Sequence, residues 1–428
     1  MIYFFASFYL EAASRISTFQ LGNGLKVILA PVENVEAACV MLYHLTGVRD
    51  DPPEIRGASS LYQTLMLSET QNLEALDRVM FTKKFGGSSS IRINYDNSIF
   101  CQMVPETELN EALWFESERI SSLRLQDQNI ENLKNYMQNR LERMSQSNIH
   151  FRAGNWIKSK VFEGTIYQTP IYGDPEKITD FDSQKIKKIY DNFRNLSDII
   201  MVISGKFDAN AIKDSIYKRF AGLSFAKKTG KKKYTKVSPR SEYVYRNWTI
   251  DKLQQQFIMY GIRAPAMNSF DYLYFDFIRY YLLDNRISKL ERQLIRNDLD
   301  VALSHEFTDN IEANALIIEI SAEKRIDLEK AKIILNKELS ALTTKLLSGS
   351  EMRLVRELME IDLKKNMQDL KLRSFLLAHY YHLALYNNID FSREYLNRLR
   401  RITTHDIIRV SKTYLKKENL VVLNVYGK

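Results

Sequence analysis

Strand-like and helix-like segments follow one another in an order that repeats once along this sequence. The first half opens with two strand patterns around a Gly-Asn-Gly turn at 18–32, followed by an apolar strand at 36–48. A second hairpin pattern follows at 88–105, with amphipathic helices before and after it. The second half begins with a strand at 253–265 and closes with another at 419–427, again with helices between them.

This repeat limits the fold class. A chain of 428 residues is too long for one typical hydrophobic core. Strand blocks that alternate with pairs of helices across short connections are typical of α+β domains. The pattern therefore predicts two related α+β domains, each a mostly antiparallel sheet with helices packed on one face.

A basic segment separates the two halves. The run "KKTGKKKYTK" at 227–236 is typical of a solvated linker. We therefore expect an N-terminal segment at 1–17, a first domain at 18–225, a linker at 226–240 and a second domain at 241–428.

The net charge of +9 does not by itself indicate nucleic-acid binding. It arises from 61 Lys and Arg against 52 Asp and Glu, and both signs are interspersed along the chain. We therefore predict that nucleic acid is not a partner.

The N-terminal stretch "MIYFFASFYLEAAS" is consistent with two interpretations. Its apolar run followed by small residues is similar to a secretory signal, but it lacks a basic start, and Glu11 lies close to any cleavage point. A signal remnant and an ordinary N-terminus both stay open, so the periplasm or cell envelope is favoured and the cytoplasm is the alternative. No apolar run of 18 residues occurs, so no membrane-spanning helix is expected.

The chain contains two cysteines, Cys39 and Cys101, each within an apolar strand-like run. Two cysteines are too few for a disulfide framework, so the sequence predicts buried free thiols. A single bridge between neighbouring strands is the alternative.

Several segments in a fixed order together resemble one known family. They are "FQLGNGLKVILAPV", "GVRDDPPEIRG", "FGGSSSIRINYDNSIFCQMVP", "LNEALWFESERISSL", "YQTPIYGDPEKI", "IIMVISGKFD" and "ITTHDIIRVSKTYLKKENLVVLNVYG". This ordered set resembles the M16 (insulinase/pitrilysin-like) metallopeptidases, especially half-size bacterial and mitochondrial-processing-peptidase-like members. The resemblance implies two homologous M16-type domains and spans nearly the whole chain.

The resemblance also implies where a zinc site would lie. In that family the helix after the entry loop carries H-x-x-E-H, in which two histidines bind zinc and the glutamate activates water. The matching positions here start at Ser60 and end at Thr64, with Gln63 in place of the base. The third ligand falls on Arg140, and Glu142, two residues later, is rotated by about 200° around a helix. We therefore predict no catalytic residue, no bound metal and no cofactor, although the family would use zinc.

A second family feature is an Arg/Tyr pair that orients the substrate backbone. An ungapped match puts Lys289 at the arginine and Ala302 at the tyrosine. If the alignment with the family is shifted, Arg286 instead matches the arginine of this pair. These substrate-binding positions are therefore predicted to be degenerate as well.

No other motif indicates a catalytic site. Of the six histidines, only His379 and His382 have helical i, i+3 spacing, and no third ligand lies near them in sequence. A helix-surface or helix-packing pair is therefore the preferred interpretation. The Gly-Gly pair in "FGGSSS" is interpreted as a helix C-cap and turn.

These residues favour a non-catalytic M16-like subunit. The resemblance implies that half-size chains pair around one chamber, so the expected partners are a second M16-like subunit with an intact zinc motif, or a second copy of this chain, and an unfolded peptide. An active zinc metalloendopeptidase with an unrecognised site is one alternative. A structural core-type subunit of a larger complex is the other.

Overall fold

The computed structural model describes most of the chain. The described residues are 16–66, 69–74, 80, 83–173, 181–225, 234–235, 237–253, 255–384 and 391–428, without the side chains of 62–64 and 192. Most of the predicted N-terminal segment, and residues 226–233 and 236 of the predicted linker, lie outside this part. Within it, no helix combines the length and apolar composition needed to cross a membrane.

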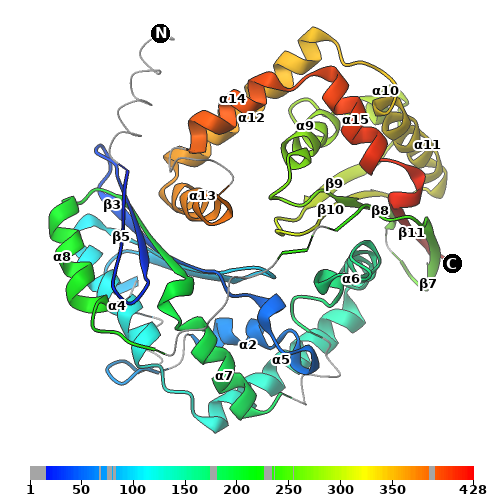
Figure 1. Ribbon diagram of the computed structural model, residues 1–428. Helices are drawn as coiled ribbons and strands as arrows, with labels where there is room; N and C mark the ends of the chain where they lie inside the picture. Colours follow the sequence, from blue (N-terminus) through cyan, green and yellow to red (C-terminus); the bar gives the residue numbers. More distant parts are fainter. Residues whose placement is uncertain are drawn as a thin grey trace. The chain divides into compact units, whose positions relative to one another are not determined.

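The chain divides into two compact units, and each unit takes a segment from the opposite half of the sequence (Figure 1). The first unit comprises Met1–Arg143, Ile171–Lys231 and Lys364–Glu394, and the second comprises Met144–Pro170, Lys232–Leu363 and Tyr395–Lys428. The predicted domain boundaries, which follow the sequence repeat, stay a prediction.

The first unit is built on a six-stranded sheet in the order β1-β2-β6-β3-β5-β4. Its neighbouring strands are antiparallel except for the parallel pair β2–β6. The strands are β1 (Ser17–Gln20), β2 (Lys26–Pro31), β3 (Ala37–His44), β4 (Ser88–Ile93), β5 (Ser98–Pro105) and β6 (Ile199–Gly205). The helices are α2 (Ala58–Leu65), α4 (Leu109–Ser121), α5 (Asp127–Ser147), which runs past Arg143, α7 (Ser183–Phe193), α8 (Ala209–Phe220) and α13 (Leu370–Leu383).

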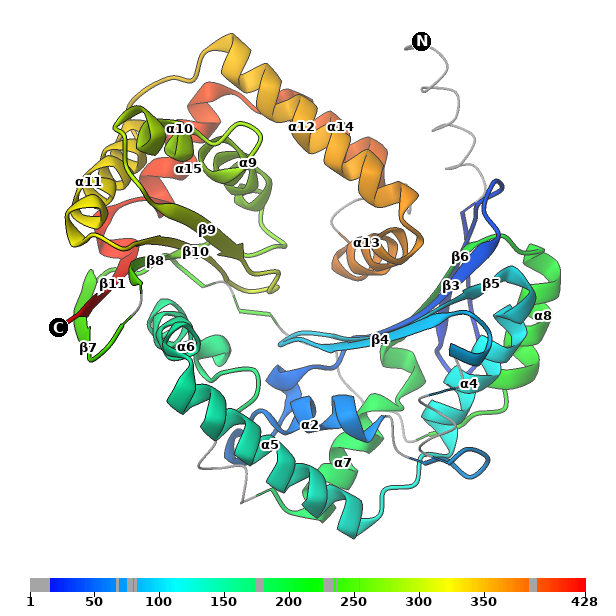
Figure 2. The same cartoon turned by 180° about the vertical axis from the view of Figure 1, so that it is seen from behind.

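Strand β3 is buried on both faces. Successive side chains alternate between faces of a sheet. Tyr43 points toward α13, where its hydroxyl lies 2.7 Å from His379 Nδ1. The next residue, His44, points to the opposite face and donates from Nδ1 to the carbonyl oxygen of Phe193 (2.8 Å) at the end of α7. Figure 2 shows α13 on one side of this sheet and α4 and α8 on the other.

The second unit is built on a five-stranded sheet in the order β7-β11-β8-β10-β9, in which only β7 and β11 are parallel. The strands are β7 (Val244–Ile250), β8 (Gln256–Ala264), β9 (Ala302–Phe307), β10 (Asn314–Ala322) and β11 (Leu420–Gly427). The helices are α6 (Ile149–Val161), α9 (Asp271–Leu283), α10 (Lys289–Arg296), α11 (Arg325–Leu342) and α15 (Thr404–Tyr414). Two further helices, α12 (Gly349–Gln368) and α14 (Phe391–Arg401), run across the boundaries between the units.

This second sheet is also covered on both faces. Tyr260 of β8 lies in the apolar cluster that α9, α11 and α15 form with the sheet. On the opposite face α6 approaches Gly261 so closely that a Cβ there would lie 2.5 Å from Val161 Cγ2. Two largely antiparallel sheets with packed helices confirm the predicted α+β class. The predicted packing on one face was wrong, because α13 and α6, from the opposite halves of the sequence, cover the second faces.

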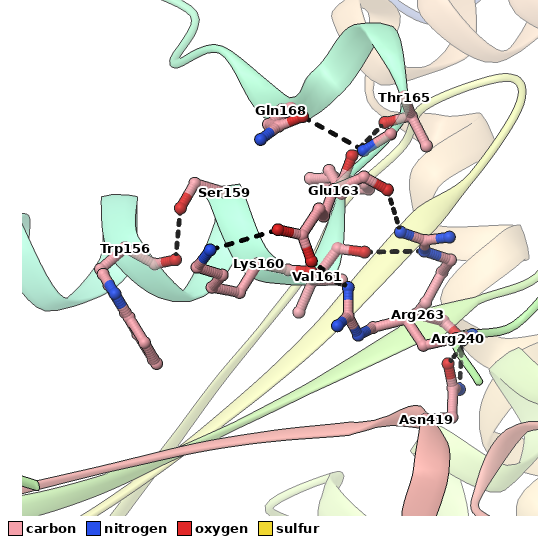
Figure 3. Close-up of polar contacts among 12 residues, drawn as sticks. Trp156, Ser159, Lys160, Val161, Glu163, Thr165, Gln168, Arg240, Arg263 and Asn419 are labelled. Atoms are coloured by element: carbon pink, nitrogen blue, oxygen red, sulfur yellow. Dashed lines mark hydrogen bonds and ion pairs between the residues drawn. The ribbon is translucent and has the colours of Figure 1, made fainter. Parts of the chain in front are cut away.

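Two arginines donate hydrogen bonds to backbone carbonyls at the end of α6 (Figure 3). Arg263 donates from Nε to the carbonyl of Val161 (2.7 Å) and from Nη2 to that of Glu163 (2.8 Å), while Arg240 donates to the carbonyl of Lys160. The last carbonyls of a helix lack intrahelical partners, so these contacts fasten α6 to the second sheet. Burial lowers the pKa of Arg263 to about 10. Asn419 completes the network by accepting from the backbone of Arg240 (2.7 Å) and donating to the carbonyl of Arg263 (2.8 Å).

The start of α2 is organised by Asp51 in the preceding loop. Its buried carboxylate accepts hydrogen bonds from the backbone N–H of Gly57 (2.9 Å) and Ser59 (3.0 Å), and from the Ser59 hydroxyl. The first N–H groups of a helix have no intrahelical partner, so Asp51 supplies one. Burial raises the pKa of Asp51 to about 7, against the opposing effect of these hydrogen bonds.

Gly57 is required at the helix entry for two reasons. Its φ of 104° lies in the left-handed region that favours glycine. In addition, a Cβ on Gly57 would lie 2.3 Å from the Cα and N atoms of Gly173. The segment "RGASS" can therefore enter α2 only with glycine at this position.

We predict that Gly57→Ala lowers the free energy of unfolding by at least about 2 kcal/mol, because both the backbone angle and the clash oppose it. Urea unfolding followed by circular dichroism measures the change. Gly222→Ala is the matched control, since a Cβ there meets nothing within 4 Å. A Gly57→Ala variant as stable as the control would contradict this account of the helix entry.

Asp51 makes stability depend on pH. Its folded pKa of about 7 lies above the usual value near 4, so the folded chain holds a proton that the unfolded chain releases. The stabilisation that comes from this raised pKa is fully present below about pH 4, and it is lost as pH rises through about 7. We expect the stability of the wild type relative to Asp51→Asn to fall by about 1 to 3 kcal/mol between pH 5 and pH 8.

Urea titrations at both pH values test this expectation. Asp208→Asn is the control, because Asp208 also caps a helix, accepting from the Ala211 N–H (2.8 Å), but is exposed. The interpretation fails if the relative stability of wild type and Asp51→Asn is the same at both pH values.

Candidate functional site

The positions that match the zinc motif lie on α2. Ser60 is buried, with 4% of its surface exposed, and the neighbouring Leu61 packs in the core. Gln63 and Thr64 belong to the same helix, and their side chains lie outside the described part of the structure. The structure thus keeps the helix that the resemblance implies, with an apolar side that anchors it.

The hydroxyl of Ser60 is used locally. Its Oγ donates to the carbonyl of Gly57 at 2.6 Å, within the hydrogen bonds that start α2. Structural and catalytic zinc sites use thiolate, imidazole and carboxylate ligands, and a neutral serine hydroxyl is not one of these. Ser60 is therefore a structural residue of the helix entry.

Arg140 and Glu142 lie on α5, and both are exposed. The buried side of that helix is formed by Leu133, Met137 and Leu141. Glu142 accepts a hydrogen bond from Gln138 Nε2 at 2.9 Å. Arg140 presents a cation where a zinc ligand would be an anion.

The residues at these positions do not fit a zinc ion. A hydroxyl that donates to a backbone carbonyl and an exposed guanidinium offer it no ligand, and glutamine offers only a neutral amide. Over the described ranges, no group of three or more His, Cys, Asp or Glu side chains is arranged to hold a metal. We therefore derive no chemical step through a metal at α2.

The pair His379 and His382 lies on α13. His379 is buried, hydrogen-bonds to Tyr43 across the sheet and stacks on Phe375, with 5.2 Å between ring centroids. Burial lowers its pKa to about 4, so the imidazole is neutral at physiological pH. The structure places His379 in helix-to-sheet packing.

The other histidines lie on other elements of the fold. His44 is buried with its pKa lowered to about 3 by burial, and His150 stacks on Phe257 with 4.1 Å between ring centroids. His305 lies on β9 and His405 on α15.

The three predicted substrate-orienting positions lie in the second unit. Lys289 is the first residue of α10 and Ala302 the first residue of β9. Arg286 forms ion pairs with Asp284 (2.7 Å) and Asp362 (2.6 Å), and these hydrogen bonds raise the pKa of its guanidinium. Arg286 is therefore held by two carboxylates of its own unit.

Lys289 lines a cavity of about 340 Å³ between α10 and the start of α12. Arg292 and Arg296 extend the basic lining, and Tyr281 and Glu351 form part of the wall. Neither Arg286 nor Ala302 lines this cavity, so it does not bring the three positions together.

Two features were missed by reasoning from sequence. Asp51 was assigned no role, because it lies seven residues before the first residue of α2 and matches no local capping pattern. No local sequence pattern indicates that Arg240 and Arg263 bind the end of α6, because these contacts join segments about 80 to 100 residues apart.

Family models match both halves of the chain. Residues 26–174 match the family described as Insulinase (Peptidase family M16), and residues 180–359 match the Peptidase M16 inactive domain. Together these matches cover most of the sequence. The sequence itself contains no H-x-x-E-H.

Individual proteins agree with this assignment. The Zinc protease PqqE of Helicobacter pylori (strain ATCC 700392 / 26695) is 22% identical over 404 residues, which cover 92% of this chain and 89% of that protein. A protease from Helicobacter pylori of known crystal structure has a TM-score of 0.87 at 17% identity, covering 96% of this chain and 99% of that chain.

The periplasmic protease PqqL from Escherichia coli has a TM-score of 0.76 at 15% identity, covering 96% of this chain and 47% of that chain. At these identities the structural likeness establishes the fold. With both halves matched by M16 models, the chain belongs to the M16 peptidase family, as a half-size member.

Proposed function

We propose that this protein is a non-catalytic M16 subunit. It pairs with an M16 chain that carries an intact zinc motif, and the two chains form a chamber that holds an unfolded peptide. Its contribution is to complete the chamber and bind the peptide, while the partner supplies the chemistry.

The residues on α2 and α5 carry this proposal. The helix entry keeps its capping carboxylate, its obligatory glycine and its buried leucines, so α2 is maintained as a structural element. The four positions that would bind zinc and activate water hold Ser60, Gln63, Thr64 and Arg140. Helix α2 is otherwise intact, while every ligand and the base are replaced. This combination favours a subunit that does not hydrolyse peptides.

The edge of the first sheet supports the binding role. β4 is the terminal strand, and it begins with the exposed residues Ser88 and Ser89. An extended peptide can add to such an edge through backbone hydrogen bonds, which are largely independent of sequence. That mode suits a subunit that holds unfolded chains.

The register shows which backbone groups face outward. The Asn94 N–H donates to the Asn97 carbonyl at 2.8 Å, so the backbone groups of Asn94 point toward β5. Backbone direction alternates along an antiparallel pair, which turns Ser90 toward β5 and Ser89 away from it. The N–H and C=O of Ser89 are therefore offered to a peptide.

A second candidate is an active zinc endopeptidase with an unrecognised site. It is favoured by the names of the similar proteins, which include a zinc protease and a periplasmic protease. The periplasmic relative also supports a periplasmic location for this chain.

Metal analysis and peptide cleavage separate the two candidates. We expect the purified chain to bind no stoichiometric zinc and to cleave no peptide alone, and to raise cleavage when added to an M16 chain with intact H-x-x-E-H. The matched variant restores the motif through Ser60→His, Gln63→Glu, Thr64→His and Arg140→Glu. We expect this variant to bind zinc, because it supplies three ligands and the base. One tightly bound zinc per wild-type chain, lost on changing residues 60–64, would refute the proposal.

Peptide binding tests the edge strand. Ser89→Pro removes one outward N–H, and an edge strand tolerates proline where that group is outside the ladder. A hydrogen bond contributes about 1 kcal/mol, so we expect a labelled unstructured peptide to bind about fivefold more weakly in fluorescence anisotropy. Ser89→Ala keeps the N–H and should bind like wild type. Equal affinity for a folded Ser89→Pro variant would argue against binding at β4.

A further inference from the structure

The two cysteines of the chain meet inside the first unit. Cys39 on β3 and Cys101 on β5 are free thiols, and their Sγ atoms lie 3.3 Å apart. Cys39 is 0% exposed and Cys101 is 1% exposed. The contact joins neighbouring strands across 62 residues of sequence.

The strand register explains why the sulfurs meet. Cys39 is paired with Met103, and Cys101 is paired with Met41. The two cysteines are therefore diagonal neighbours on the same face of an antiparallel pair, where Cα atoms lie about 7–8 Å apart. A disulfide needs its sulfurs at about 2.05 Å and its Cα atoms within about 7 Å, so forming the bond also draws the two strands slightly together.

The surroundings make the two thiols unequal. The hydrogen bond from Cys101 lowers the pKa of Cys39, and the Ser374 hydroxyl and the charge of Lys371 act in the same direction. The same contact and burial raise the pKa of Cys101. Thiolate is the reactive form of cysteine, so Cys39 is the more readily ionised thiol of the folded pair.

Helix α13 covers this face of the sheet. Ser374 donates to the hydroxyl of Ser204 on β6 at 2.9 Å, and His379 hydrogen-bonds to Tyr43 on β3 at 2.7 Å. Once α13 is in place, the buried thiols are out of reach of a dissolved oxidant or reductant. Because α13 follows Cys101 by about 270 residues, both strands are synthesised well before the helix that covers them.

We propose that Cys39 and Cys101 are the site of an intramolecular disulfide, formed by a disulfide-bearing oxidant before α13 docks and protected by α13 afterwards. The thiolate of one cysteine attacks one sulfur of the oxidant, forming a mixed disulfide and releasing one thiol. The thiolate of the other cysteine then attacks the protein sulfur of that mixed disulfide, forming the protein disulfide and releasing the second thiol. Two protein thiols are oxidised, and one oxidant disulfide is reduced to two thiols.

This bond would link β3 to β5, the strand that carries the edge strand β4. Cross-linking restricts the unfolded chain, so the oxidised protein should be more stable than the reduced one. The inference concerns the assembly of the first unit and does not depend on peptide binding or on a partner.

Mass spectrometry of the full chain tests the site. Chain unfolded and then refolded with oxidised glutathione is expected to lose the mass of two hydrogen atoms and to yield a proteolytic fragment pair joining Cys39 to Cys101. Its Tm is expected to rise by several degrees above that of the reduced chain. Cys39→Ser and Cys101→Ser should instead each take up glutathione. Glutathione adducts or intermolecular bridges alone in the wild type would overturn the site.

Protection by α13 is tested on the folded, reduced chain. We expect oxidised glutathione to leave it unchanged, and His379→Leu, which removes the contact with Tyr43, to become oxidised. His405→Leu, a change of an exposed histidine on α15, should remain protected. Oxidation of the folded wild type as fast as during refolding would overturn the shielding.

Should refolding fail, expression in an oxidising and in a reducing bacterial compartment tests the disulfide site. An absent cross-link in the oxidising compartment rejects it.

Discussion

The central strands of both sheets are buried on two faces, and the rest of the structure depends on this constraint. Strand β6 is buried at every position, and β3 and β5 at most, because helices cover both sides. A strand buried on both faces reads as a continuous apolar run, as in "IIMVIS". In each unit the second face is covered by a helix from the opposite half of the sequence, α13 in the first and α6 in the second.

The same constraint explains how α2 can persist without the H-x-x-E-H residues. The helix is held by its entry, where Asp51 and Gly57 satisfy the backbone, and by Leu61 and Leu65 in the core. None of these groups is a metal ligand in the family pattern. The positions matched to the zinc motif are not these anchoring residues, so the motif can be replaced while the fold keeps the element.

Much of the fold could be predicted from local patterns. The Gly-Asn-Gly turn predicted the β1–β2 hairpin, and the alternation in "SSSIRINYDNSIFCQMVP" predicted β4 and β5, because both depend on residues close in sequence. The interpretation of α2 rests on residue type alone, since serine, glutamine and arginine are not among the zinc ligands of proteins. The role of Asp51 was missed because its burial depends on packing around the loop.

The sequence by itself determined the α+β class, the positions of most strands and helices, and the absence of H-x-x-E-H ligands. Each of these depends on periods of two or about 3.6 residues, or on the chemistry of single side chains. The tertiary structure decided that α13 covers β3, that α6 is fastened by Arg240 and Arg263, and that Cys39 meets Cys101. Hydrophobic packing is non-directional, so a local pattern shows that a face must be buried, while only the packed chain determines which distant segment covers it.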